Sequence, residues 1–141
     1  MFDYILDLFG NKRQQKTRFT DVEQQALMTI HNYVNGQLDN EKTFDKLNRI
    51  RKEFYNLINE DGQSTIDQDT PIWMNSLFGY QFDRWQKFQL LKKHFLDHPE
   101  ELVGETATNF EDICQMGIEQ EFLDACKFIL KEHPLNNRVK Q

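Results

Sequence analysis

The sequence is poor in the residues that mark small disulfide-stapled domains, since its 141 residues include only two cysteines, three prolines and six glycines. It also lacks any apolar run near the roughly 18 residues that a transmembrane helix requires, which excludes a membrane span. The chain begins with MFDYILDLFG, which has no basic segment of the kind that opens a secretory signal. The low cysteine content and the missing signal together predict a cytoplasmic protein.

The two cysteines, Cys114 and Cys126, lack the CxxC spacing of metal and redox sites. Both stand among apolar residues at helical spacing. We therefore expect both to be buried thiols of a hydrophobic core.

Positive charge is also scarce, with 17 basic against 23 acidic residues and a net charge of −6. Phosphate backbones and anionic lipids repel such a chain, so we expect no direct binding to nucleic acid or membranes, and a basic protein is the complementary partner. Residues 94–126 contain no lysine or arginine and nine acids: Asp97, Glu100, Glu101, Glu105, Glu111, Asp112, Glu119, Glu121 and Asp124. This stretch is either a solvated face or a surface that steers a basic partner into place.

Apolar residues recur at helical spacing along almost the whole chain, and no run alternates with the period of two that a strand requires. The sequence therefore predicts an all-α fold, with one domain over residues 1–141 built as a bundle of about six helices with short connections. We expect a basic connection at 11–19, an acidic loop at 61–71 and a frayed tail at 135–141.

The ends of these helices are predicted from capping residues, glycine and proline. The predicted starts are two capping boxes, Thr20 with Glu23 and Thr108 with Glu111, an N-cap at Asp39 or Asn40, and the Thr70-Pro71 pair. The predicted ends are Gly10 for a helix over 2–9, Gly36, Gly79, His98-Pro99 for a helix from about Tyr80 to Asp97, and His133-Pro134. Gly117 either breaks or kinks the helix in which it lies.

Aromatic side chains are dense between residues 73 and 85, where Trp73, Phe78, Tyr80, Phe82 and Trp85 follow one another. Such a cluster is typical of a core corner in a helical protein. The alternative is that part of it is exposed and anchors a partner, since tryptophan and tyrosine dominate interface energetics. On that reading the contact candidates are Trp73, Tyr80 and Trp85.

Few features of the sequence indicate catalysis. No nucleophile elbow, P-loop or glycine-rich nucleotide motif is present. His94 and His98 stand four residues apart, so both could reach one metal ion with Asp97 or Glu101, but Pro99 puts His98 at a helix boundary. Asp67-Gln68-Asp69 lacks the glycine and the distal glutamate of a calcium loop. We expect no cofactor, and a small metal-dependent helical enzyme is the second alternative.

Three segments carry a resemblance to a known family. Residues 30–54 run from one helix through a turn into another, with Gly36, Leu38, Glu41 and Phe44 at the places that the family pattern occupies. Together with FDRWQKFQLLKKHFLDHPE and IEQEFLDACKFILKE, this segment resembles bacterial immunity proteins of the colicin D and contact-dependent growth inhibition type. The resemblance covers about half the chain. It implies a small helical protein that blocks a nuclease toxin.

The resemblance and the charge distribution agree on one functional prediction. We expect an immunity or inhibitor protein, not an enzyme, that binds a cognate basic toxin through an acidic surface and covers its active site. The expected partner-binding residues are Asp67, Asp69, Glu100, Glu101, Glu105, Glu111, Asp112, Glu119 and Glu121. The alternative is an adaptor or subunit of a larger bacterial or phage assembly, docked by the aromatic cluster.

Overall fold

The computed structural model describes residues 17–60 and 67–133, and these contain helices and turns but no strand. The all-α prediction is therefore confirmed. The predicted helix at 2–9, the tail 135–141, and parts of the basic connection 11–19 and the acidic loop 61–71 lie outside the described residues. In the part that is described, no helix is long and apolar enough to span a bilayer.

Four helices of at least 15 residues carry the packing: α2 (Thr20–Val34), α3 (Asn40–Ile58), α5 (Phe82–Asp97) and α7 (Ile118–Glu132). Two more are minor, since α4 (Ile72–Ser76) has five residues and α6 (Gly104–Cys114) has no buried residue. The predicted bundle of about six helices is thus corrected to four packed helices, because helical periodicity does not distinguish a helix that packs from one that projects.

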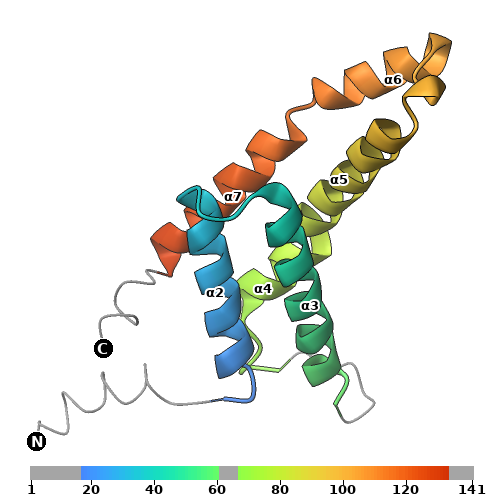
Figure 1. Cartoon of the computed structure of the whole chain (residues 1–141). Helices are drawn as coiled ribbons and strands as arrows, with labels where there is room; N and C mark the ends of the chain where they lie inside the picture. The colour runs from blue at the N-terminus through green and yellow to red at the C-terminus, as the bar shows by residue number, and fades with distance from the viewer. Residues whose placement is uncertain (1–16, 61–66, 134–141) are drawn as a thin grey trace, which may run out of the picture.

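One hydrophobic core joins these helices, as expected for a single domain. At its centre Trp85 of α5 stacks on Phe122 of α7, with ring centroids 4.4 Å apart. Tyr33 of α2 lies 6.0 Å from Trp85 and 5.6 Å from Phe122, and Phe44 of α3 lies 6.3 Å from Trp85. The stack therefore contacts all four long helices. Figure 1 shows α2 and α3 side by side and antiparallel.

One helix runs without interruption from Ile72 to Asp97, so the predicted end at Gly79 is wrong. α4 passes into a π-helical turn, η1 (Leu77–Gln81), which continues directly into α5. Gly79 lies on the exposed side, and a glycine inside a helix costs only about 1 kcal/mol. Burial of the opposite face outweighs that cost. The buried residues of that face are Met74, Leu77, Phe78, Phe82 and Trp85.

Several predicted helix ends are confirmed. Asp39 is the N-cap of α3, where its carboxylate accepts from the backbone N–H of Lys42 at 2.8 Å. Gly36 follows α2 with a φ of 76°, and α5 ends at Asp97 before His98-Pro99. Gly117 has a φ of 72° and separates α6 from α7, so it breaks the helix.

Both predicted capping boxes are wrong. The Thr20 hydroxyl accepts from the N–H of Thr17 at 2.8 Å, and the Glu23 carboxylate accepts from the indole N–H of Trp73 at 2.8 Å. α6 begins at Gly104, so Thr108 lies inside it and donates to the Gly104 carbonyl at 3.3 Å. The contact between Glu23 and Trp73 takes the place of the first capping box. The second does not form because α6 begins before Thr108.

The Thr70-Pro71 start is displaced by one residue. Pro71 is the N-cap of α4, which begins at Ile72, and no side chain caps this helix. The Thr70 side chain is buried and points back, where its hydroxyl donates to Asp67 Oδ1 at 3.2 Å and accepts from the Asp67 N–H at 3.1 Å. It therefore closes the end of the loop instead of opening the helix.

Beyond Phe88, α5 leaves the core and forms a projecting hairpin with α6 (Figure 1). We call residues 94–117 the arm. The arm comprises the end of α5, the 3-10 turn η2 (Pro99–Glu101) and α6, and none of its residues is buried. Phe110 of α6 joins the two sides, with its ring 5.0 Å from Phe95 and 6.5 Å from Phe88.

The arm also separates the two cysteines. Cys126 of α7 is fully buried as predicted, and burial raises the pKa of its thiol to about 12. Cys114, at the end of α6, is exposed. The prediction for Cys114 is wrong, because the apolar spacing around it belongs to a helix that does not pack on the core.

The central stack predicts a large difference between two phenylalanines of α7. Phe122→Ala removes a buried ring against Trp85, and we expect the free energy of unfolding to fall by about 3–5 kcal/mol. Phe128 is 62% exposed, so Phe128→Ala should change it by less than about 0.5 kcal/mol. Denaturant titration of both variants measures the difference, and equal losses would contradict the assigned core.

The two glycines at 79 and 117 predict opposite effects of the same substitution. Gly117→Ala places a Cβ in the left-handed region and should lower the free energy of unfolding by about 1–2 kcal/mol. Gly79→Ala adds a methyl group in a helix, with no atom within 4 Å, and should raise it by about 0.5–1 kcal/mol. Thermal and denaturant unfolding test the pair, and destabilisation by Gly79→Ala would count against the continuous helix.

Candidate functional site

Most of the predicted partner-binding acids have partners within the chain. Asp67 accepts from Arg18 Nη1 at 3.0 Å and also accepts from the N–H of Asp69 at 3.0 Å. The hydrogen bond from Arg18 is the main reason that the pKa of Asp67 is held below its ordinary value. Asp67 therefore organises the end of the loop.

Glu119, in the first turn of α7, holds three elements together. Its Oε2 atom accepts from Lys92 Nζ at 2.8 Å and from Gln89 Nε2 at 2.6 Å, both on α5, and from Asn40 Nδ2 of α3 at 3.3 Å. Partial burial alone would raise the pKa of Glu119. The hydrogen bonds from Lys92 and Gln89 and the charge of Lys92 together outweigh that effect, so the pKa is lowered.

Glu121 makes the second ion pair between α5 and α7. Its two carboxylate oxygens accept from Arg84 Nε at 2.9 Å and from Arg84 Nη2 at 3.3 Å. This two-point contact is the main reason that the pKa of Arg84 is raised above its ordinary value. Both acids at the start of α7 therefore fix the helix packing and are not free for a partner.

Two further acids pair with histidines at the outer end of the arm. Glu101 Oε1 lies 2.8 Å from His94 Nε2, and Glu100 Oε2 lies 3.4 Å from His98 Nδ1. The hydrogen bond from His94 is the first cause of a lowered pKa at Glu101. These four side chains are all exposed.

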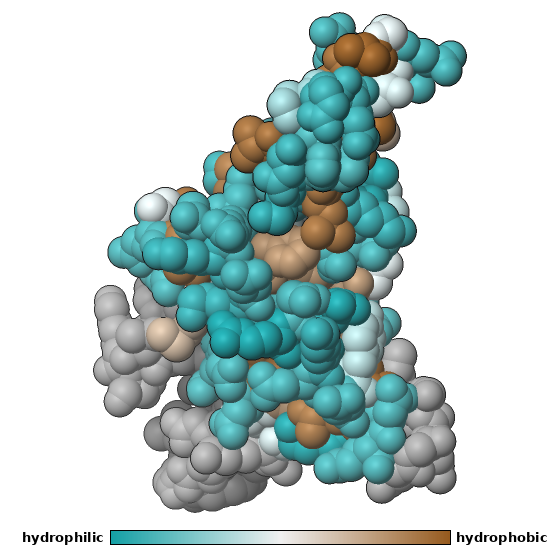
Figure 2. All heavy atoms as spheres, turned by 45° about the vertical axis from the view of Figure 1, so that its right-hand side comes forward, coloured by the Kyte–Doolittle hydropathy of each residue, from teal (hydrophilic) through white to brown (hydrophobic). Residues whose placement is uncertain are grey.

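Four predicted acids have exposed carboxylates with no side-chain partner among residues 17–60 and 67–133: Asp69, Glu105, Glu111 and Asp112. Three of them lie on α6, and the arm contains no lysine or arginine. Apolar side chains project from the same arm, with Leu96 80% exposed and Val103 and Met116 more than half exposed. Figure 2 shows hydrophobic side chains scattered among hydrophilic ones along this projection.

The aromatic candidates divide between core and surface. Trp85 is fully buried in the central stack, so it is not a contact residue, and its place in the core corrects the prediction. Trp73 is half-buried, and its indole N–H is occupied by Glu23. Tyr80 alone is well exposed, at 56%, with the Arg84 guanidinium 5.5 Å from its ring centroid.

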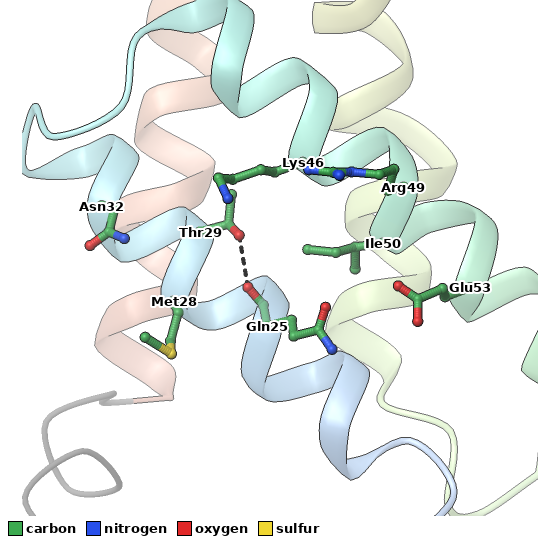
Figure 3. A pocket seen from close by; sticks show the side chains of 8 residues that line it. All are labelled: Gln25, Met28, Thr29, Asn32, Lys46, Arg49, Ile50 and Glu53. Carbon is green, nitrogen blue, oxygen red and sulfur yellow. Dashed lines mark hydrogen bonds between the residues drawn. The ribbon is translucent and has the colours of Figure 1, made fainter.

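The described surface includes two sizeable hollows. The first, of about 400 Å³, lies between α2 and α3, and Figure 3 shows its side chains: Gln25, Met28, Thr29, Asn32, Lys46, Arg49, Ile50 and Glu53. The Thr29 hydroxyl donates to the Gln25 carbonyl at 2.8 Å, so it is not poised as a nucleophile. The lining of this hollow contains no histidine or cysteine and so lacks the Ser–His and Cys–His pairs of nucleophilic catalysis.

The second hollow, of about 530 Å³, lies between the start of α3 and the outer part of α5. Phe44, Leu90 and Leu96 give it an apolar lining, and charged side chains at its edge include Glu41 and Lys93. Leu96 belongs to the arm, so the groove continues into the arm surface. Sequence reasoning missed this groove because its two sides are about 45 residues apart in the chain, and only tertiary packing brings them together.

The contacts of Glu119 predict a pH-dependent contribution to stability. Glu119→Gln should lower the free energy of unfolding at pH 7 by about 1 kcal/mol, after allowance for solvent screening. Because the folded-state pKa lies below the ordinary 4.5, wild type loses this contribution as the pH falls through the folded-state value, and the difference between the two proteins should vanish. Glu111→Gln, which removes an unpartnered carboxylate, is the control. A Glu119→Gln difference that persists unchanged at pH 3 would contradict this assignment.

The comparisons with known proteins add no relative. No protein-family model matches the chain, and no curated protein or solved structure matches it. The resemblance to immunity proteins therefore stays a prediction from the sequence, and the case for any function depends on the surface just described.

Proposed function

We propose that this protein is an inhibitor of the immunity type, which binds a basic toxin domain through the arm and covers its active site. The observation that carries the proposal is α6, an exposed helix with three acids that have no side-chain partner in the described part of the chain. We place this encounter in the cytoplasm, since both thiols are free and a reducing compartment keeps them so.

Electrostatics supports this role for α6. A nuclease holds its substrate phosphates with lysine and arginine side chains, and carboxylates can take the place of those phosphates. Glu105, Glu111 and Asp112 would supply them, because the arm contains no lysine or arginine that could pair with them. An acidic surface of this kind raises the rate of encounter with a basic partner and rejects partners of like charge.

The apolar side chains of the arm support the same proposal. Leu96, Val103 and Met116 are exposed on the same arm as these acids, and a protein interface combines apolar contact with a charged rim. The groove of about 530 Å³ that Leu96 also lines would receive an apolar side chain of the partner. The arm can therefore supply both contact area and charge complementarity.

The internal ion pairs narrow the set of binding residues. Glu105, Glu111 and Asp112 are the binding acids on this proposal. Glu119 and Glu121 act as positioning residues, because their bonds to α5 fix the helix from which the arm extends. Asp67 stabilises the loop before α4 through Arg18 and Thr70, far along the chain from α6.

A pull-down from the source cells identifies the partner on which the proposal is tested. The tagged chain is incubated with lysate at about 50 mM and at about 500 mM salt, and retained proteins are identified by mass spectrometry. We expect one basic protein that is retained at low salt and released at high salt. It should kill cells that lack this chain and spare cells that express it.

Two matched triple variants then test the arm directly. Glu105→Gln with Glu111→Gln and Asp112→Asn should weaken binding to the purified partner by about 100-fold and abolish protection. The control, Asp21→Asn with Glu53→Gln and Glu132→Gln, neutralises three exposed acids outside the arm and should stay within about threefold of wild type. Equal effects of the two triples, or a partner that is neither basic nor toxic, would overturn the proposal and favour an adaptor.

A further inference from the structure

Two histidines and two glutamates meet at the outer end of the arm. His94 lies in the last turn of α5, and His98 is the C-cap residue of that helix. Glu100 and Glu101 follow in η2. Pro99 ends the α-helix, yet it does not separate the histidines, because the His94 and His98 ring centroids lie 4.8 Å apart. The turn that Pro99 begins brings Glu101 Oε1 to 2.8 Å from His94 Nε2 and Glu100 Oε2 to 3.4 Å from His98 Nδ1.

Three donor residues of this cluster, His98, Glu100 and Glu101, are close enough to share one ion. One ligand atom from each of His98, Glu100 and Glu101 lies within 4.8 Å of the others. His94 Nε2 lies 2.8 Å from Glu101 Oε1, so a second imidazole nitrogen lies next to one of these three donors. Tetrahedral zinc with Zn–N bonds of about 2.0–2.1 Å holds two imidazole ring centres about 5 Å apart. The spacing of the two rings already fits that geometry.

We propose that His94, His98, Glu100 and Glu101 form a surface binding site for a divalent transition metal ion of the zinc type. The two imidazole donors favour zinc, copper or nickel over calcium and magnesium, which prefer oxygen ligands alone. Binding through His94 Nε2 would take the place of its hydrogen bond to Glu101.

The surroundings of the site favour a structural ion over a catalytic one. All four side chains are exposed, and neither hollow of the described surface includes any of them. The ion would join the last turn of α5 to η2, the segment that leads into α6. It would thereby fix the outer end of the arm and offset part of the local negative charge. This role goes beyond toxin inhibition and does not depend on it.

Calorimetric titration of the full chain with zinc chloride tests the site. We expect about one zinc ion per chain, with binding weakened at least about tenfold in His98→Ala and in the double variant His94→Ala with His98→Ala. The matched control, His31→Ala with His133→Ala, removes the other two histidines and should bind as wild type does. Calcium chloride should give no binding heat at the same concentration.

Two further variants separate this site from other metal donors. Cys114→Ser removes the exposed thiol and should leave zinc binding unchanged, whereas Glu101→Gln should weaken it. Circular dichroism confirms that each variant is folded. Absence of stoichiometric zinc binding, or binding that survives loss of both His94 and His98, would overturn the proposal. Because no partner protein is present, failure here is distinct from failure of the inhibitor proposal.

Discussion

The stack of Trp85 on Phe122 is the contact on which the rest of the structure depends. It lies where the helix from Ile72 to Asp97 meets α7, and Tyr33 and Phe44 bring α2 and α3 onto the same pair of rings. Trp85 is fully buried, and its indole N–H has no partner in the described part of the chain. Burial of this N–H without a partner costs free energy, and the burial of several aromatic side chains around the same point offsets that cost.

The position of this stack also explains the arm. α5 extends well past Trp85, and its last buried residue is Phe88, so the outer part of the helix has no core beneath it. The chain must return along α6 to reach the start of α7, and Phe110 gives this return path its main contact with α5. Ion pairs of Glu119 and Glu121 with α5 then fix the start of α7. The acidic stretch 94–126 is therefore continuous in sequence but divided in the structure. Glu119 and Glu121 of α7 are ion-paired with α5, whereas the acids of α6 have no side-chain partner among the described residues.

Much of the fold follows from local patterns, and what escapes them is decided by tertiary contacts. The period of the apolar residues predicts the long helices, and local chemistry places helix ends correctly at Asp39, Gly36 and His98-Pro99. The expected helix end at Gly79 is wrong because burial of the opposite helix face outweighs the low helix propensity of glycine. Within the candidate site, exposure of α6 and the pairing of Glu119 depend on residues distant in sequence. No local signal distinguishes Glu119, which is ion-paired with Lys92, from Glu111, whose exposed carboxylate has no side-chain partner among the described residues.

The arm contributes no buried side chain to the core, so substitutions of its exposed residues should leave the folded state intact. On the proposed function, α6 can therefore be varied to test binding without loss of folding. Glu111 and Asp112 are neighbours of like charge, and mutual repulsion of unpaired carboxylates raises the energy of the free protein. A cation that approaches this surface, from a basic protein or as a metal ion at the end of the arm, relieves part of that repulsion. This repulsion is one physical reason for the proposal that the arm binds a positively charged partner.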